Sequence, residues 1–161
     1  MTYRIEALPL EPFTGYFAMT DAELAAVGAR RWVADAPGRA PCRVSLRDAE
    51  AGERLVLVHH GHMTDPSSPY RASGPIFVRE AAVQAEPVDG PAPEMLRKRP
   101  LSLRIYDRRN MMMEGLVIDG AELDARLEEW FSHPATGQVH IHFAPRGCYL
   151  ARAVRQEPTL S

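Results

Sequence analysis

Residues 101–118 read LSLRIYDRRNMMMEGLVI, which is two apolar stretches separated by a short charged one. The stretches Leu101 to Tyr106 and Met111 to Ile118 have the length and apolar composition of β-strands. The tetrapeptide 107–110 between them has the polar side chains of a turn. The sequence therefore predicts a β-hairpin here, and the other elements can be worked out from it in both directions.

An amphipathic helix is predicted directly after this hairpin. Residues 119–122 read DGAE, a capping box in which Asp119 is the cap. The apolar residues that follow at helical spacing share one stripe: Leu123, Leu127, Trp130 and Phe131. Pro134 ends this helix, and the stretches Val139 to Phe143 and Cys148 to Val154 predict a final hairpin.

The N-terminal half contains a second helix and several strands. Thr20 and Glu23 form a capping box that opens a helix over Ala22 to Val27. Five further stretches are predicted as strands from their apolar content or alternation: Thr2 to Leu8, Arg30 to Ala34, Arg43 to Leu46, Arg54 to His60 and Pro75 to Val78. Strand and helix do not alternate regularly, so a doubly wound parallel sheet is disfavoured.

These elements predict one α+β domain over residues 1–161, because neither a domain linker nor an internal repeat interrupts the sequence. Its core would be a single mixed, largely antiparallel β-sheet of seven to eight strands, with two main helices packed on it.

Composition and charge argue against several classes of protein. A formal net charge of −2 gives no broad attraction for nucleic acid or for an anionic membrane surface. The N-terminus has no secretory signal, and no apolar run approaches the length of a membrane span. Two cysteines make no disulfide framework, so we expect a soluble, cytoplasmic protein. The oligomeric state is not predicted.

One polar segment has the composition of a pocket for a small anionic molecule. Tyr70, Arg71, Ser73 and Arg79 surround the rigid turn at 74–75. Donors where a loop meets a strand commonly build such pockets, and arginine binds carboxylates through its planar fork. Residues on other strands could complete the site: Arg43 with Ser45, or Arg104 with Tyr106. Alternatively, Arg71 and Arg79 hold loop carbonyl groups in place.

Histidines form a second candidate site. His59, His60 and His62 are close in sequence, while His140 and His142 stand two apart on a predicted strand and therefore share a face. Two such imidazoles supply half of a zinc or iron site. The candidate metal ligands are thus His60, His62, His140 and His142. The alternative is a hydrated polar strand face, and the ligand spacing of a cupin barrel is absent.

Cys42 is a candidate catalytic nucleophile. Its neighbour Arg43 can lower the pKa of a thiol, but catalysis would also need a base, which a distant histidine would have to provide. The alternative is a small buried residue at the start of a strand.

Two long strings in the centre of the chain resemble a known family. They are PCRVSLRDAEAGE at 41–53 and SPYRASGPIFVR at 68–79, with a Pro-Phe pair at 12–13 and an Asp-Ala-Glu-Leu helix start at 21–24. The sequence resembles the bacterial family catalogued as domain of unknown function 1203. That resemblance implies a single small bacterial domain and brings no activity, cofactor or catalytic residue with it.

Three functional hypotheses follow, in order of preference. The first is binding of a small anionic ligand, as a binding domain or an enzyme, through Arg43 and the 68–79 segment. The second is a non-catalytic module that presents a sheet edge or residues 80–93 to a protein partner. The third is a metal-dependent enzyme that uses the histidine cluster. No resident cofactor is predicted.

Overall fold

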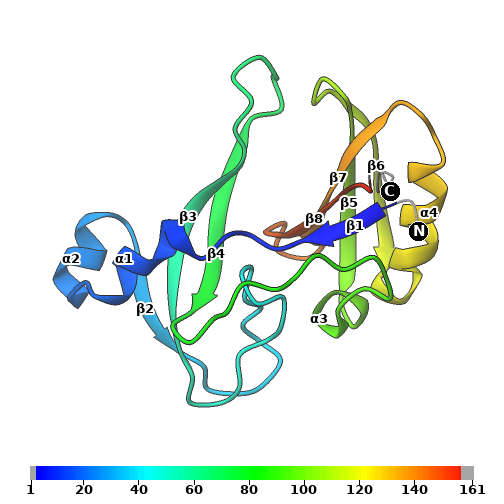
Figure 1. Ribbon diagram of the computed structural model, residues 1–161. Coiled ribbons are helices and arrows are strands. Elements are labelled where there is room, and N and C mark those ends of the chain that lie inside the picture. The colour runs from blue at the N-terminus through cyan, green and yellow to red at the C-terminus, as the bar shows by residue number, and fades with distance from the viewer. Residues whose placement is uncertain (1–2, 157–161) are drawn as a thin grey trace, which may run out of the picture.

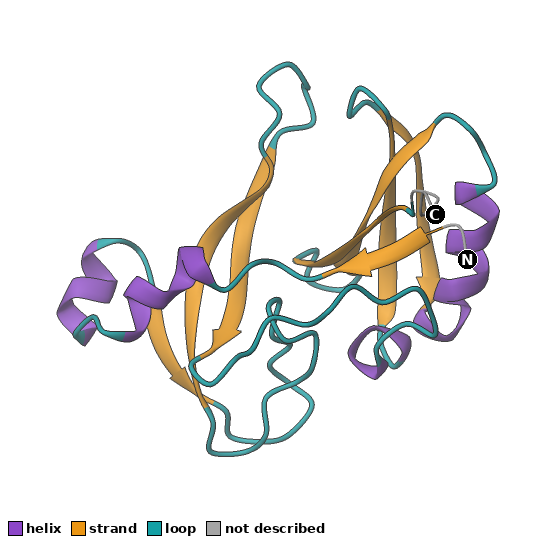
Figure 2. Cartoon of the chain, in the orientation of Figure 1, coloured by secondary structure: helices purple, strands orange, loops and turns teal. Residues whose placement is uncertain are grey.

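The computed structural model describes residues 3–156, and these residues form eight β-strands in two separate antiparallel sheets (Figures 1 and 2). The larger sheet has the strand order β1-β8-β7-β5-β6 and the smaller sheet has the order β2-β3-β4. The strands of the larger sheet are β1 (Tyr3–Glu6), β5 (Pro100–Asp107), β6 (Met112–Asp119), β7 (Thr136–Phe143) and β8 (Tyr149–Arg155). Those of the smaller sheet are β2 (Arg30–Val33), β3 (Arg54–Met63) and β4 (Ala72–Arg79).

The predicted hairpin at 101–118 is confirmed as the pair β5–β6, in which Leu103 faces Leu116. The carboxylate of Asp107 accepts hydrogen bonds from the backbone amides of Arg109 and Met111 at 2.8 and 3.0 Å, which closes the turn. Asn110 adopts the left-handed conformation, with φ of 60°, that asparagine tolerates better than most residues.

The predicted C-terminal helix is also confirmed, as α4 (Leu123–Phe131), preceded by a 3₁₀ turn at Gly120–Glu122. Asp119 caps this 3₁₀ turn by accepting from the amide of Ala121 at 2.9 Å, whereas Glu122, the N-cap of α4 itself, makes no capping hydrogen bond with its side chain. Gly120 is required there, because a Cβ atom at this position would lie 2.2 Å from the carbonyl oxygen of Leu96. Leu123, Leu127 and Phe131 bury the apolar stripe of the helix against the larger sheet.

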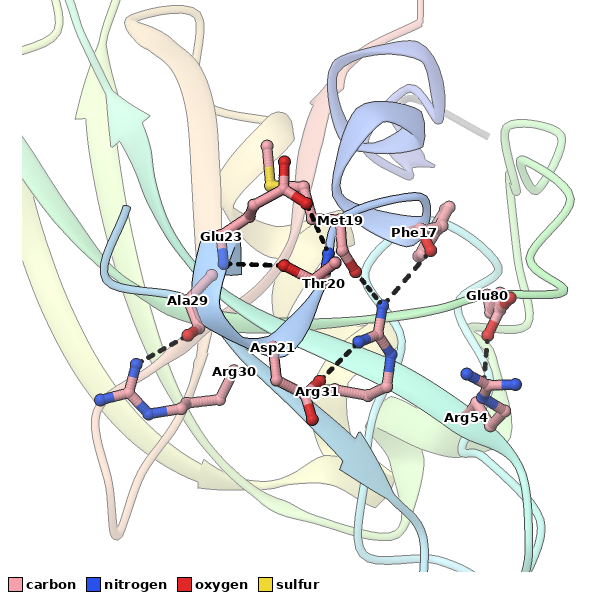
Figure 3. Close-up of polar contacts among 10 residues, drawn as sticks. All are labelled: Phe17, Met19, Thr20, Asp21, Glu23, Ala29, Arg30, Arg31, Arg54 and Glu80. Atoms are coloured by element: carbon pink, nitrogen blue, oxygen red, sulfur yellow. Dashed lines mark hydrogen bonds and ion pairs between the residues drawn. The ribbon is translucent and has the colours of Figure 1, made fainter. Parts of the chain in front are cut away.

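The smaller sheet packs its own core against short N-terminal helices. Val56 and Val58 of β3 join Leu24 of α2 (Asp21–Ala26) in this core. The capping box predicted for α2 is confirmed, since the Thr20 hydroxyl accepts from the Glu23 amide and the Glu23 carboxylate accepts from the Thr20 amide (Figure 3). The remaining helices are the single turns α1 (Thr14–Phe17) and α3 (Glu94–Arg97) and a 3₁₀ turn at Glu11–Phe13.

Arg31 of β2 links these helices to the edge of the smaller sheet. Its guanidinium pairs with Asp21 at 2.7 Å and donates to the carbonyl oxygens of Phe17 and Met19 at 3.3 and 2.8 Å (Figure 3). These contacts hold α1 and α2 against β2.

The prediction of one continuous sheet is wrong, because the eight strands divide into two sheets. The predicted strand Arg43 to Leu46 is also wrong: these residues form turns, in which the Leu46 amide donates to the carbonyl oxygen of Cys42 at 3.0 Å. Leu46 adopts a φ of 53°, which breaks an extended conformation. The segment has the apolar alternation of a strand because Val44 and Leu46 are both buried in this turn.

The two sheets approach each other through the polar face of the larger one. Figure 1 shows α4 on the side of the larger sheet that faces away from the smaller sheet. The β3–β4 loop reaches the β5–β6 turn, where the Ser68 hydroxyl donates to the carbonyl oxygen of Asn110 at 2.6 Å. Within residues 3–156, every helix is too short or too polar to cross a membrane.

Candidate metal centre

Strand β7 has one apolar face and one polar face. Val139 and Ile141 are fully buried in the core beneath α4. Gln138, His140 and His142 alternate with them and therefore project from the opposite face of the sheet. Neighbouring strands add further polar side chains to this face, because directly paired residues point the same way: Ser102, Arg104 and Tyr106 of β5, and Arg152 of β8.

His62 reaches the same place from the smaller sheet. In the pairing of β3 with β4, Gly61 faces Ser73 and Met63 faces Ala72, so His62 is the extra residue of a β-bulge. Bulges bend a strand locally and redirect a side chain. Here the His62 ring lies 4.9 Å from the His142 ring and 5.8 Å from the His140 ring, between ring centres.

The three imidazoles form a compact cluster. His62, His140 and His142 each offer a ring nitrogen, and these three nitrogens lie within 4.8 Å of one another. His140 and His142 are 1% and 0% exposed, and His62 is half-buried. The ring of Tyr149 stacks on His62 at 5.2 Å between ring centres and forms one wall of the cluster.

The rings of His140 and His142 each have one nitrogen that makes a hydrogen bond within the protein. That bond determines which nitrogen of the ring carries the proton. Nδ1 of His142 lies 2.9 Å from the carbonyl oxygen of Gly147. A carbonyl oxygen can only accept a hydrogen bond, so Nδ1 is the protonated nitrogen. The other nitrogen, Nε2, therefore carries a lone pair.

A chain of three hydrogen bonds determines which nitrogen of His140 carries the proton. The carboxylate of Asp65 accepts from Nδ2 of Asn110 at 2.9 Å, and Oδ1 of Asn110 accepts from Nε2 of Gln138 at 2.7 Å. These contacts leave Oε1 of Gln138 to accept from Nε2 of His140, at 2.9 Å. Nδ1 of His140 is therefore the nitrogen with the lone pair.

Each of the three rings has one buried nitrogen that lacks a hydrogen-bond partner among residues 3–156. These atoms are Nδ1 of His140, Nε2 of His142 and Nδ1 of His62. Leaving one buried polar atom unsatisfied costs about 1–3 kcal/mol. A ligand that binds to all three atoms would remove this cost.

Burial keeps the cluster uncharged. Desolvation lowers the pKa of His140 to about 3, and the neighbouring His142 and His62 act in the same direction. Desolvation likewise lowers the pKa of His142 to about 3 and that of His62 to about 4. All three rings are therefore neutral at pH 7, which is the form that binds a metal ion.

His60, the fourth predicted metal ligand, lies elsewhere. It pairs with Gly74 on β4, and its ring packs against Phe13 at 5.6 Å between ring centres. Gln138, Asn110 and Asp65 were not singled out from the sequence. The alternation of Gln138 with His140 and His142 was the available signal for the first of them.

The arginines of the predicted anion site do not share one opening. Arg43 is 2% exposed and donates to the carbonyl oxygens of Tyr149 and Pro41 at 2.7 and 2.5 Å. Burial lowers the pKa of this guanidinium. Arg71 donates to the carbonyl oxygens of Pro66 and Ser68 at 2.6 and 3.1 Å.

The other residues of that prediction are also engaged within the protein. Arg79 pairs with Glu53 and donates to the Ser45 hydroxyl at 3.2 Å. Ser73 lies 2.8 Å from His59, between Oγ and Nε2. Tyr70 is 37% exposed, and its ring contacts Tyr106 edge-on. Binding of an anion by this set stays a prediction.

Cys42 is completely buried, and its sulfur accepts from the backbone amides of Ser45 and Arg79 at 3.5 and 3.4 Å. These contacts suit a packed thiol at the junction of β4 and the 43–46 turn. A catalytic role for Cys42 stays a prediction.

Comparison with known proteins gives one result for this chain. The family model described as "Protein of unknown function (DUF1203)" matches residues 39–155, a range that includes His62, His140, His142 and Arg104. Neither the curated proteins nor the solved structures gave a match. Since the matched range covers more than half of the 161 residues, the chain belongs to the family of proteins of unknown function DUF1203.

Proposed function

We propose that this protein is a metal-dependent enzyme whose centre is one divalent transition metal ion, zinc foremost, bound by His62, His140 and His142. The observation that supports it most strongly is the convergence of three imidazoles from two different sheets, each with a buried nitrogen that lacks a partner among residues 3–156. Imidazole nitrogen suits zinc, copper, iron and nickel, whereas magnesium and calcium prefer oxygen ligands.

The size of the cluster fits one ion after a small adjustment. Zinc–nitrogen bonds of about 2.0–2.1 Å in a tetrahedron hold two ligand nitrogens about 3.3 Å apart. The nitrogens lie within 4.8 Å of one another, so modest rotations of the rings bring them into range. His62 stands at a bulge, where such an adjustment disturbs little of the strand pairing.

A single metal ion can satisfy all three unpartnered nitrogens at once, with His62 in the tautomer that leaves the lone pair on Nδ1.

The ligand set favours catalysis over a purely structural role. Structural zinc sites use four protein ligands, while catalytic sites use three and leave a position for water or substrate. The cluster of described residues contains three histidines and neither cysteine. A metal bound there would polarise a substrate oxygen or lower the pKa of a bound water. Gly147 and Gln138 orient two of the three ligands.

Metal titration of protein purified without a histidine tag tests this proposal. We expect isothermal titration calorimetry to give one Zn²⁺ per chain, and His62→Ala to weaken binding at least about 100-fold by removing one of three ligands. The matched control is His59→Ala, which removes an exposed histidine of the same strand and should leave zinc binding unchanged. Substoichiometric binding by the wild type, or equal binding by His62→Ala, would contradict the proposal.

A further inference from the structure

Arg104 lies beside the histidine cluster and has no polar partner among residues 3–156. On β5 it pairs directly with His140 of β7, so both side chains project from the polar face of the larger sheet. Its side chain is half-buried, and within residues 3–156 its guanidinium makes neither a hydrogen bond nor an ion pair. A half-buried, unpaired guanidinium has five unused donors and an uncompensated charge.

The strand register places Arg104 at the cluster. Arg104 is directly opposite His140, and Ser102, two residues before it on β5, is opposite His142. The guanidinium therefore projects from the same face of the sheet as both of these imidazoles.

Other arginines on this face are neutralised. Arg152 flanks His140 from the opposite side, on β8, but it pairs with Glu6 at 3.4 Å. Arg4 pairs with the same carboxylate at 3.6 Å. Within residues 3–156, Arg104 thus lacks the carboxylate partner that Arg152 and Arg4 share, and it also lacks the carbonyl acceptors that hold Arg43. An anion from solution would neutralise the charge of Arg104.

Two tyrosine rings restrict the shape of that anion. Tyr106 contacts His140 edge-on at 5.1 Å between ring centres, and Tyr149 contacts it at 5.4 Å. These tyrosines are 1% and 3% exposed, so an anion held at the cluster would lie against two buried rings. A planar carboxylate can pack against an aromatic ring, and it matches the planar fork of arginine.

We propose that Arg104 binds the carboxylate of a small anionic substrate, an inference that rests on the proposed metal centre. One oxygen of that carboxylate, or a neighbouring oxygen of the substrate, would occupy the open position on the metal. The substrate class is therefore a carboxylic acid. This site differs from the one predicted around residues 68–79, whose arginines are held by internal partners.

Cobalt-loaded protein and acetate test the inference. Co²⁺ replaces zinc in the same ligand geometry and absorbs visible light, so binding of acetate to the metal changes the spectrum. We expect saturable binding in the wild type and an affinity at least about tenfold lower in Arg104→Met, the loss that follows removal of a hydrogen bond between charged groups. Arg104→Lys keeps the positive charge but loses the planar guanidinium. Its acetate affinity should lie between those of the wild type and Arg104→Met, and it replaces Arg104→Met in the test if that variant folds poorly.

Arg152→Met is the matched control, because it removes the same charge from the other side of His140. It should change acetate affinity less than about threefold, since that charge is already paired. An equal loss in both variants, or tighter Arg104-dependent binding of phosphate than of acetate, would overturn the inference.

Cobalt uptake separates the two proposals. Absence of Co²⁺ binding by the wild type would contradict the metal centre itself. Normal Co²⁺ uptake with acetate binding that is unaffected by Arg104→Met would leave the metal centre standing and overturn only the carboxylate site.

Discussion

Nε2 of His140 donates a hydrogen bond to Oε1 of Gln138 at 2.9 Å. The direction of this bond is determined by Asn110, whose side-chain oxygen accepts from the amide nitrogen of Gln138. Together they fix the orientation of the His140 ring and leave Nδ1 as the nitrogen with the lone pair. Outer partners of this kind orient a metal ligand and raise its basicity.

Replacement of Gln138 should therefore weaken metal binding without removing a ligand. We expect Gln138→Leu to raise the dissociation constant for Zn²⁺ about 10–100-fold, because His140 loses the acceptor that orients it. Calorimetric titration measures the change. Gln84→Leu, at an exposed position outside the sheets, is the control. Unchanged affinity in Gln138→Leu would show that this hydrogen bond does not orient the ligand.

Metal should also stabilise the whole fold, because His62 belongs to one sheet and His140 and His142 to the other. A ligand at 100 times its dissociation constant adds about 2.7 kcal/mol to the free energy of unfolding. For a protein of this size that raises Tm by about 5–10 °C. Differential scanning calorimetry with Zn²⁺ and with EDTA measures the difference. A similar increase in His62→Ala would mean that the metal binds somewhere else.

The metal-free protein should lose stability when the pH falls below about 6.5, the ordinary pKa of an unfolded histidine. Native His140 and His142 have pKa values near 3, so between pH 6.5 and 4 the unfolded state binds more protons. Each of these histidines then contributes up to about 1.4 kcal/mol per pH unit, and stability rises with pH. Urea unfolding at pH 6.5 and 5.5, above the usual range of carboxylates, measures the slope. Constant stability over this interval would contradict neutral buried rings.

Arg43 should contribute to the stability of the fold and not to ligand binding. Arg43→Met leaves the carbonyl oxygens of Tyr149 and Pro41 without their donor, at a cost of about 1–3 kcal/mol for each buried group. Urea unfolding should show this loss, while zinc affinity stays unchanged. The control is Arg30→Met, which removes an exposed arginine and should change the free energy of unfolding by less than about 0.5 kcal/mol. A stable Arg43→Met variant would reopen the anion site predicted from the sequence.

Elements that depend on neighbouring residues could be predicted from the sequence. The β5–β6 hairpin follows from a polar turn between two apolar stretches, and the caps at Thr20 and Asp119 follow from side chains within three residues. The division into two sheets could not be predicted, since apolar alternation marks a strand but not its partner. The turn at 43–46 was misread for the same reason, because burial alone produces that pattern.

The candidate metal centre was partly visible in the sequence. The shared face of His140 and His142 follows from the two-residue period of a strand. The choice of His62 over His60 as the third member depends on the bulge in β3 and on the approach of the two sheets, and neither leaves a local signal. Arg104 was named from the sequence only as one of several residues that could complete an anion site.

X-ray absorption spectroscopy at the zinc edge of the tag-free, zinc-loaded protein tests the metal centre most directly. The account predicts three imidazole nitrogens and at least one non-protein oxygen, at about 2.0–2.1 Å from the ion. Sulfur in the coordination shell, or fewer than two imidazoles, would contradict a centre built from His62, His140 and His142.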